Sequence, residues 1–336
     1  MSLDHSLQLL HHWSQTALDH LPPQAQEVLF HPLVPKAASA LLALGVLRTA
    51  NRSLSYWSAN NWQKARPWQK ERELVLVTGG CSGIGKQIMQ DLVQAGVRVV
   101  ILDIQEPSFK LPSNVTFYKA DITSSENIHC VAEKIRVAHG DPTVLVNNAG
   151  VGHDGTILDE PEAKIQQTFA VNTVSHFLMV REFLPSMVQQ NHGHVITIAS
   201  MASFVAVGEM VDYCCSKASA LAFHEGLGQE LRHWYQAPKV RTSVVHPLWV
   251  RTPMIQQLTD AGQQFKQPVL TPEMVSAAVV KQILTQSSGQ VIVPTTHTPI
   301  SLVRAFPSWL QDAARSVGSK DLLNLRKWQT SQLSTK

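Results

Sequence analysis

The chain has 336 residues and a mass of 37.1 kDa, and 28 Lys and Arg against 25 Asp and Glu give it a formal net charge of +3. This length fits one large α/β domain with an extension, and a hydrophobic content of 44% excludes a disordered chain. Charged residues make up 16%, below the roughly 25% of an average soluble domain, which suggests contact with an apolar partner. Lys and Arg are scattered rather than clustered into a stripe, so no nucleic-acid partner is expected.

The first 72 residues form an extension. Residues 1–27 lack a basic segment before an apolar run, so they do not resemble a secretory signal, and their leucines near helical spacing predict an amphipathic helix. The run 37–47 carries no charge, and extended back to Val28 it reaches the roughly 20 residues that cross a bilayer. We therefore expect a membrane-associated segment over 28–47. A helix packed on the domain or on a second subunit, as in a homodimer, remains open, and so does the choice between spanning the membrane and lying on it.

Charge around this segment is asymmetric. No Lys or Arg precedes Lys36, whereas six basic residues lie between 48 and 72, together with the aromatic residues that favour membrane interfaces. The positive-inside bias then places the large domain in the cytosol.

Residues 73–295 alternate between short apolar runs and helical patterns. Strands are predicted at 73–78, 97–103, 115–121, 144–148, 194–200, 240–246 and 290–294. Helices are predicted at about 84–95, 124–139, 161–190, 209–235 and 272–286. Apolar strands separated by helices predict an α/β fold, a doubly wound parallel sheet that binds its ligand at the carboxyl ends of the strands.

A glycine-rich turn follows the first strand. Glycines there allow a tight turn and let backbone amides approach a pyrophosphate, while the helix N-terminus adds a positive dipole end. The turn residues expected to hold a dinucleotide are Gly79, Cys81, Ser82, Gly83, Ile84 and Gly85. Asp103 ends the second strand, where a carboxylate binds the ribose diol and repels a 2′-phosphate, so NAD is favoured over NADP.

Tyr213 and Lys217 are four residues apart in a predicted helix and therefore share one face. An ammonium beside a phenol lowers the phenol's pKa toward working pH, as a tyrosine general acid/base requires. Ser200, at the end of the fifth strand, lies where ligands bind and can hold a substrate oxygen.

These residues carry a family resemblance over about residues 73–295. The turn TGGCSGIG, Asp121-Ile122, the NNAG segment ending at Gly150, Asn172, Ser200 and Tyr213-x-x-x-Lys217 follow the order and spacing of the short-chain dehydrogenase/reductase family. The resemblance implies a single-domain Rossmann oxidoreductase that moves a hydride between a nicotinamide and a carbonyl or alcohol carbon.

The resemblance also implies residue roles. Tyr213 would be the general acid/base, Ser200 would position the substrate oxygen, and Lys217 would bind the nicotinamide ribose and depress the pKa of Tyr213. Asn172 would hold a water of a proton relay. Further cofactor contacts would come from Asp121, Ile122, Asn148, Ala149, Gly150, Val250 and Thr252.

One segment departs from the family pattern. Leu248 follows Pro247 where family members generally have Pro-Gly, so either the pocket is reshaped or the backbone there has a negative φ. A catalytically idle dinucleotide-binding membrane scaffold or redox sensor is the alternative function that this departure favours.

The substrate pocket is expected to be apolar. The residues proposed to line it are Trp249, Met254, Ile255, Leu258 and Phe265. Residues 296–336 form a C-terminal amphipathic segment and tail, in which an apolar stripe over 300–310 predicts either a membrane-surface helix or a cover over the pocket.

An apolar N-terminal segment before such a domain resembles the membrane-associated retinol and 17β-hydroxysteroid dehydrogenase-like branch. That resemblance implies a retinoid, steroid or long-chain substrate at the endoplasmic reticulum or lipid droplets. The four cysteines show no metal-ligand spacing, and no metal is expected.

Overall fold

The structure is a computed structural model that describes residues 22, 31 and 33–334. The chain divides into two units, one up to Ser58 and one from Ala59 onward. The predicted amphipathic helix within 1–27 and the start of the 28–47 segment lie outside the described residues.

The first unit contributes one described helix, α3 (Leu33–Ala59). It has 27 residues, a mean hydropathy of 1.4 over its most apolar window, and no buried side chain within that window. By length and composition it is able to cross a membrane.

The second unit is built on seven parallel strands in the order β3-β2-β1-β4-β5-β6-β9. Their bounds are β1 (Leu74–Thr78), β2 (Arg98–Asp103), β3 (Val115–Lys119), β4 (Val144–Asn147), β5 (Gly193–Ile198), β6 (Val240–Pro247) and β9 (Gly289–Val293). All seven coincide with predicted strands. Every residue of β1, β4, β5 and β6 is buried, as expected for strands covered on both faces.

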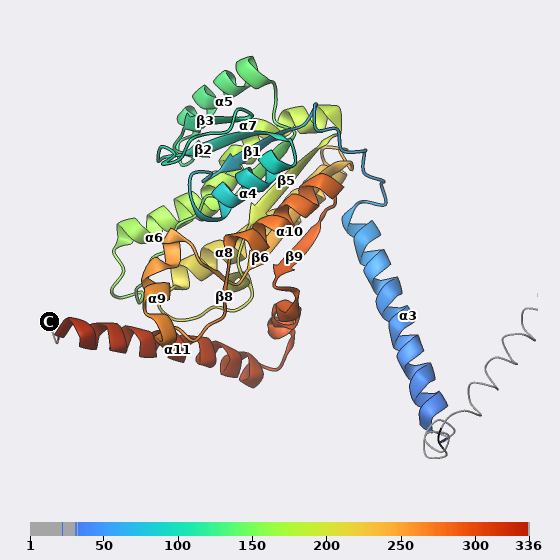
Figure 1. Cartoon of the computed structure of the whole chain (residues 1–336), viewed down its shortest axis with the longest axis vertical. Coiled ribbons are helices and arrows are strands. Elements are labelled where there is room, and N and C mark those ends of the chain that lie inside the picture. The colour runs from blue at the N-terminus through green and yellow to red at the C-terminus, as the bar shows by residue number, and fades with distance from the viewer. Residues whose placement is uncertain (1–21, 23–30, 32, 335–336) are drawn as a thin grey trace, which may run out of the picture. The chain divides into compact units, whose positions relative to one another are not determined.

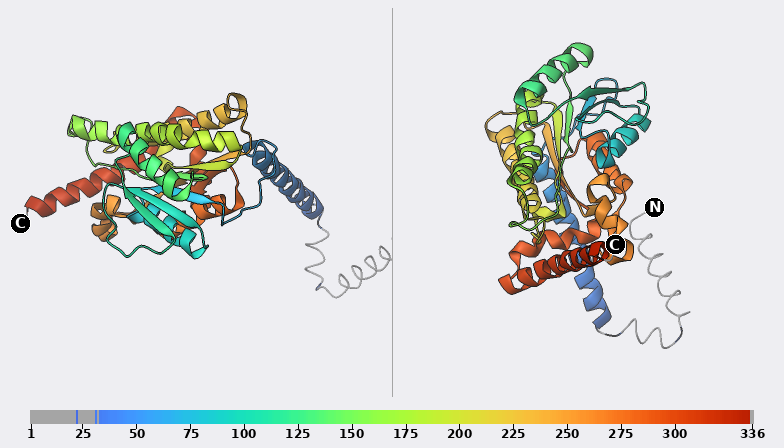
Figure 2. Two further views of the ribbon diagram at one scale, coloured as in Figure 1. Left: turned by 90° about the horizontal axis from the view of Figure 1, so that it is seen from above. Right: turned by 90° about the vertical axis from the view of Figure 1, so that its left-hand side faces the viewer.

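Helices cover both faces of this sheet, as Figures 1 and 2 show. One face carries α4 (Gly83–Gln94) and α10 (Pro272–Thr285), which pack on each other. The other carries α5 (Ser125–His139), α6 (Glu162–Phe169), α7 (Ser175–Gln190) and α8 (Val211–His233). Two apolar clusters, one on each side of the sheet, form the core. The doubly wound Rossmann architecture is thus confirmed.

The predicted helix over 161–190 is interrupted. A π-helical turn, η1 (Ala170–Val174), lies between α6 and α7. Wider turns of this kind often occur at functional sites, and this one contains Asn172.

Two segments lie outside the seven-stranded sheet. Between β6 and α10, the chain forms a short two-strand pair, β7 (Trp249–Val250) with β8 (Val269–Leu270), and helix α9 (Gln256–Asp260). After β9, the 3₁₀ segment η5 (Thr295–Ala305) leads into α11 (Ser308–Ser334). The sequence indicated an apolar stripe here, but α11 is far longer than that stripe.

Candidate active site

A cavity of about 1000 Å³ lies at the carboxyl ends of the strands. The predicted site residues that line it are Gly79, Ser82, Gly83, Ile84, Asp103, Asp121, Ile122, Asn148, Ala149, Gly150, Ser200, Tyr213, Lys217, Val250 and Thr252. Cys81, Gly85 and Asn172 are not among the lining residues. The other predicted residues all lie around this one cavity.

The glycine-rich turn brings backbone close to backbone. A Cβ on Gly85 would overlap the carbonyl oxygen of Gly79 and lie 2.5 Å from Nδ2 of Asn148. Gly79 itself has a φ of +65°, which L-residues rarely adopt. Only glycine fits these two positions.

The start of α4 is available to an anion. Its N-cap residue, Ser82, makes no side-chain capping hydrogen bond, and its first turn contains no acidic residue. Free amides and the positive dipole end together suit a phosphate group. The turn thus fits the pyrophosphate of a nicotinamide dinucleotide, which Ser82, Gly83 and Ile84 would hold.

Asp103 is fixed at the end of β2 by two backbone amides. Its Oδ2 accepts from the Cys81 amide at 2.9 Å and its Oδ1 from the Gln105 amide at 3.0 Å. Burial and the nearby Asp103 carboxylate raise the pKa of the Cys81 thiol to about 12. Cys81 is therefore an unreactive thiol, and its amide positions the carboxylate.

A threonine that the sequence reasoning did not single out joins two of the motifs. The hydroxyl of Thr78 accepts from the amides of Asn148 and Ala149, each at 3.0 Å. In return, Nδ2 of Asn148 donates to the Thr78 carbonyl at 2.8 Å. Its position at the end of β1, directly before the glycines, is the sequence feature from which this role of Thr78 could have been predicted.

Asn172 connects the wall of the cavity to the helix that carries the tyrosine. Its Oδ1 accepts from the Val151 amide at 2.8 Å, while Nδ2 donates to the Val151 carbonyl at 2.8 Å and to the Ser216 hydroxyl at 3.0 Å. Ser216, also missed from the sequence, donates to the Tyr213 carbonyl at 2.8 Å. Both amide hydrogens of Asn172 are thus used in bracing the site.

Tyr213, Lys217 and Ser200 form the polar centre of the cavity. The Lys217 Nζ lies 5.6 Å from the Tyr213 ring centroid and donates to the Ile198 carbonyl at 2.9 Å. Ser200 and Tyr213 both line the same cavity. A Cβ on Gly150 would lie 3.3 Å from Asn172 Oδ1 and 3.5 Å from Lys217 Nζ, so these two polar groups converge on the same backbone.

The expected depression of the Tyr213 pKa is not found. Burial raises the pKa of Tyr213 to about 12, and the Ser200 hydroxyl lowers it only in part. Burial also lowers the pKa of Lys217 to about 8. For Tyr213 the loss of water outweighs the hydrogen bond from Ser200, so the phenol is neutral at pH 7.

His246 supports the serine from the next strand. Its Nδ1 lies 3.0 Å from the Ser200 carbonyl oxygen, an arrangement that requires a proton on that nitrogen. Burial lowers the pKa of His246 to about 4, so the ring is neutral. This buried histidine on β6 positions the backbone of Ser200.

The departure at Leu248 is accommodated by the backbone. The φ of Leu248 is not positive. Its amide donates to the Val293 carbonyl at 2.9 Å, and its side chain packs against the core. The alternative of a negative φ is therefore correct.

The apolar lining agrees with expectation except at one residue. Trp249, Met254, Ile255 and Leu258 line the cavity, whereas Phe265 packs edge-on against Trp249 at a centroid distance of 5.3 Å. Ile300 and Val303, from the apolar stripe for which a cover over the pocket was one prediction, also line the cavity. Further lining comes from α11 residues beyond that stripe, which the sequence did not single out: Ala314, Val317, Gly318 and Leu322.

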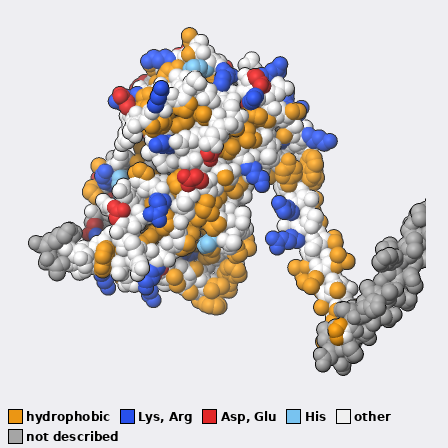
Figure 3. Space-filling view, in the orientation of Figure 1, with side chains coloured by type: hydrophobic (Ala, Val, Ile, Leu, Met, Phe, Trp, Pro, Cys, Tyr) orange, Lys and Arg blue, Asp and Glu red, His pale blue; other side chains and the backbone are white. Residues whose placement is uncertain are grey.

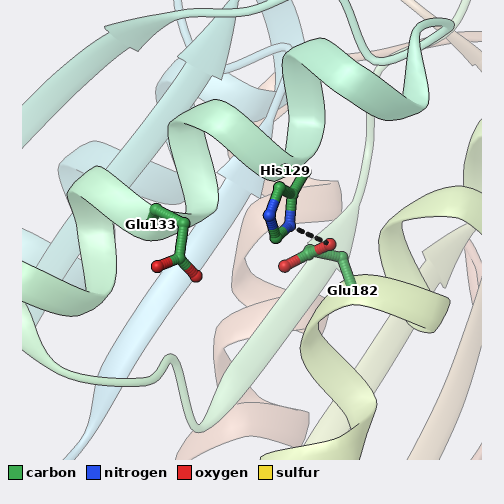
Figure 4. Close-up of side chains that lie close together, drawn as sticks. All are labelled: His129, Glu133 and Glu182. Carbon is green, nitrogen blue, oxygen red and sulfur yellow. Dashed lines mark hydrogen bonds and ion pairs between the residues drawn. The ribbon is translucent and has the colours of Figure 1, made fainter.

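Figure 4 shows one group of possible metal ligands found among the described residues, and none of its members lines the cavity. His129, Glu133 and Glu182 bring their ligand atoms together on α5 and α7. However, Arg136 forms ion pairs with Glu133 and with Glu182, each at 2.7 Å. The guanidinium of Arg136 already pairs with both carboxylates, so the group fits a surface ion-pair network.

Comparison with known proteins agrees with this geometry. The short chain dehydrogenase family matches residues 73–263. Dehydrogenase RED2 of Cochliobolus heterostrophus is 40% identical over 225 residues, which cover 65% of this chain and 85% of that protein. Estradiol 17-beta-dehydrogenase 11 of Homo sapiens is 33% identical over 233 residues, covering 67% of this chain and 75% of the relative.

A solved structure shares the fold. The 3-ketoacyl-(acyl-carrier-protein) reductase of Brucella melitensis, complexed with NADH, superposes with a TM-score of 0.59 at 20% identity, over 67% of this chain and 98% of the other. Since the family match spans more than half of the chain and includes the turn, the serine and the tyrosine–lysine pair, this chain belongs to the short-chain dehydrogenase/reductase family of oxidoreductases and resembles its retinol and 17β-hydroxysteroid dehydrogenase-like branch.

Proposed function

We propose that this protein is a membrane-attached, NAD(H)-dependent dehydrogenase of lipophilic alcohols and ketones of retinoid, steroid or long-chain type. The observation that carries the proposal is the placement of Tyr213, Lys217 and Ser200 in one cavity whose other wall is apolar. The relatives named for estradiol support a substrate of this kind.

A bound nicotinamide would supply the hydride acceptor or donor. The neutral phenol of Tyr213 gives its proton to the substrate oxygen during carbonyl reduction and is left as a phenolate. In alcohol oxidation the phenolate form takes the hydroxyl proton of the substrate and becomes the phenol again. The Ser200 hydroxyl orients that oxygen toward the phenol. The cationic Lys217 stabilises the negative charge that develops on the phenol when it loses its proton.

Asp103 supports NAD rather than NADP. Both of its oxygens are held by backbone amides, so the carboxylate cannot swing away from an approaching 2′-phosphate. A fixed negative charge at this point binds a ribose diol and repels a phosphate.

The alternative of an idle dinucleotide-binding scaffold or redox sensor rested on Leu248. Because Leu248 has no positive φ and its amide is hydrogen-bonded, the loop needs no glycine at this position. This supports a working enzyme.

Membrane attachment is proposed through α3, with the second unit in the cytosol at the endoplasmic reticulum or lipid droplets. Leu41 and Leu44 are 72% and 66% exposed, and in water their apolar surface would be unfavourable. Lys64, Arg66, Lys70 and Arg72 follow the helix on the side proposed to be cytosolic.

The decisive experiment compares wild type with Tyr213→Phe on a panel of lipophilic alcohols with NAD. Removal of the phenolic hydroxyl removes the acid/base group, so kcat should fall by roughly 10³-fold, while NADH binding, followed by fluorescence titration, should remain. Equal turnover by both proteins would remove Tyr213 from the reaction.

Attachment is tested by cell fractionation of Leu41→Lys/Leu44→Lys. The double variant should move to the soluble fraction, because a charge at the centre of a spanning helix costs about 3 kcal/mol. Asn51→Lys, in the basic half of the same helix, is the matched control and should stay with membranes. A double variant that stays in the pellet contradicts attachment by α3.

A further inference from the structure

Four large apolar side chains are exposed where η5 meets α11. Leu302, Phe306, Trp309 and Leu310 are 57%, 45%, 71% and 37% exposed. We refer to these four residues as the apolar corner. Figure 3 shows hydrophobic side chains gathered at the lower edge of the second unit, over η5 and the start of α11. Scattered exposed leucines are ordinary, but four such side chains within nine residues indicate a contact surface.

The same two elements form the mouth of the substrate cavity. Ile300 and Val303 of η5 line the cavity from one side of the apolar corner, and Val317 and Leu322 of α11 line it from the other. Val317 lines the cavity and is also 63% exposed, so the cavity reaches the surface at this point. The apolar corner therefore adjoins the opening.

The mouth is held by bonds to the body of the domain. Arg304 donates to the carbonyls of Phe204 and Ser203, at 3.2 and 3.3 Å. The Ser319 hydroxyl accepts from the Gly208 amide at 3.0 Å, and Gln267 donates to Asp321 at 2.6 Å. The apolar corner is thus a fixed feature and not a loose tail.

The charge of this region favours anionic lipid. From residue 295 to 334 there are five Lys and Arg (Arg304, Arg315, Lys320, Arg326 and Lys327) against two acidic residues. Lys320 and Lys327 are exposed on α11, and neither takes part in any ion pair among the described residues. Exposed lysines on the same helix as exposed aromatic and aliphatic side chains are typical of a surface that lies at a bilayer.

We propose that the apolar corner docks on a bilayer containing anionic lipids, and that the cavity receives its substrate directly from that bilayer. The inference rests on the proposed function for the lipophilic nature of the substrate. A bilayer is favoured over a second copy of the chain because the exposed apolar groups and the exposed Lys320 and Lys327 share helix α11, and the like charges of two such helices repel each other.

Docking is tested with the full chain in vesicles of phosphatidylcholine, with and without phosphatidylserine. The fluorescence of Trp309 is obtained as the difference between wild type and Trp309→Phe, and its quenching by brominated lipid is measured. Quenching that strengthens with phosphatidylserine is the expected result. If brominated lipid does not quench the Trp309 signal, the proposal is overturned. This outcome includes the case in which two chains pair through the apolar corner.

Substrate delivery is tested by kinetics of Phe306→Glu/Trp309→Glu, with Val137→Glu as the control. Val137 is 88% exposed on α5, on a different element. The double variant should lose about 10-fold in kcat/KM for a long-chain alcohol dissolved in the bilayer and nothing for a short water-soluble alcohol, whereas the control should lose neither. An equal loss on both alcohols overturns the proposal. Absence of turnover by wild type would reject the proposed function, while the quenching would still report docking.

Discussion

The two halves of the cavity are constructed in different ways. In the cofactor half, backbone groups set the geometry: the glycine turn after β1, the amides that hold Asp103, and the Thr78–Asn148 bonds. In the substrate half, apolar side chains come together from the loop 205–210, the segment 249–258, η5 and α11.

This difference follows from what each half must bind. A dinucleotide presents charges and hydroxyls at fixed positions, so its site needs fixed donors and acceptors. An apolar substrate needs volume and exclusion of water, and side chains of similar size substitute for one another there. A change in the cofactor half should therefore affect every substrate alike, while a change in the substrate half should alter the choice among substrates.

Among changes to the walls of the cavity, the largest effect is expected from Gly85→Ala in the cofactor half. The new Cβ would overlap the Gly79 carbonyl and displace the turn, so the Kd for NADH should rise by roughly 100-fold, or about 2.7 kcal/mol. Isothermal titration measures this. Gly226→Ala is the matched control, since a Cβ on that helical glycine meets no atom within 4 Å. Unchanged NADH affinity in Gly85→Ala would show that the turn does not hold the pyrophosphate.

A smaller effect is expected from Asp103→Asn. Loss of the negative charge removes the repulsion of a 2′-phosphate and weakens the hold on the ribose diol, so the preference in kcat/KM for NAD over NADP should fall by roughly 10- to 100-fold. Steady-state kinetics with both cofactors measures the ratio. Glu106→Gln, which removes a nearby exposed charge, should leave it within about 2-fold. If the NAD preference falls equally in both variants, it comes from the overall negative charge of this region and not from the position of Asp103.

The sequence predicted the cofactor half well because its signals are local. Each apolar run became a strand, and the residues at the carboxyl end of a parallel strand necessarily meet those of its neighbours. The pKa of Tyr213 was not predictable in the same way, because its burial depends on packing by segments far along the chain.

The substrate half was predicted less completely. Trp249 and Leu258 were expected to line the cavity, and a cover over it was one prediction for 300–310. The lining by 314–322 was not expected, because these residues include Ala314 and Gly318. Small residues that allow close approach, as Gly318 does toward Val207, give no hydrophobic periodicity to detect. The π-turn at Asn172 likewise has no pattern in the sequence.

Enlarging one of these small residues tests the substrate half directly. Ala314→Leu adds volume to the cavity wall, so kcat/KM for a long-chain or steroid alcohol should fall by roughly 10- to 30-fold while a short alcohol is unaffected. Ala313→Leu, one residue away on the exposed side of α11, is the control. An equal loss on long and short alcohols would mean that α11 influences the whole site and not substrate choice.

The smallest effect concerns the helix pair that supports both halves. His176 on α7 is 2% exposed, packs against Phe223 of α8, and has no hydrogen-bond partner for either ring nitrogen among the described residues. Burial, with a contribution from Lys217, lowers its pKa to about 3. In the unfolded chain this histidine binds a proton near pH 6.5, whereas in the folded chain it stays neutral. The contribution of His176 to the unfolding free energy is therefore fully present above pH 6.5 and is lost as the pH falls toward 3.

His176→Phe removes this titration. Between pH 7.5 and 5.5 the wild type should lose about 1.4 kcal/mol more of its unfolding free energy than the variant does. Urea unfolding at the two pH values measures the difference, and any change in packing cancels because it is common to both. His233→Phe, at an exposed histidine, should follow wild type. If His176→Phe also follows wild type, the imidazole accepts its proton inside the folded domain, and burial does not lower its pKa.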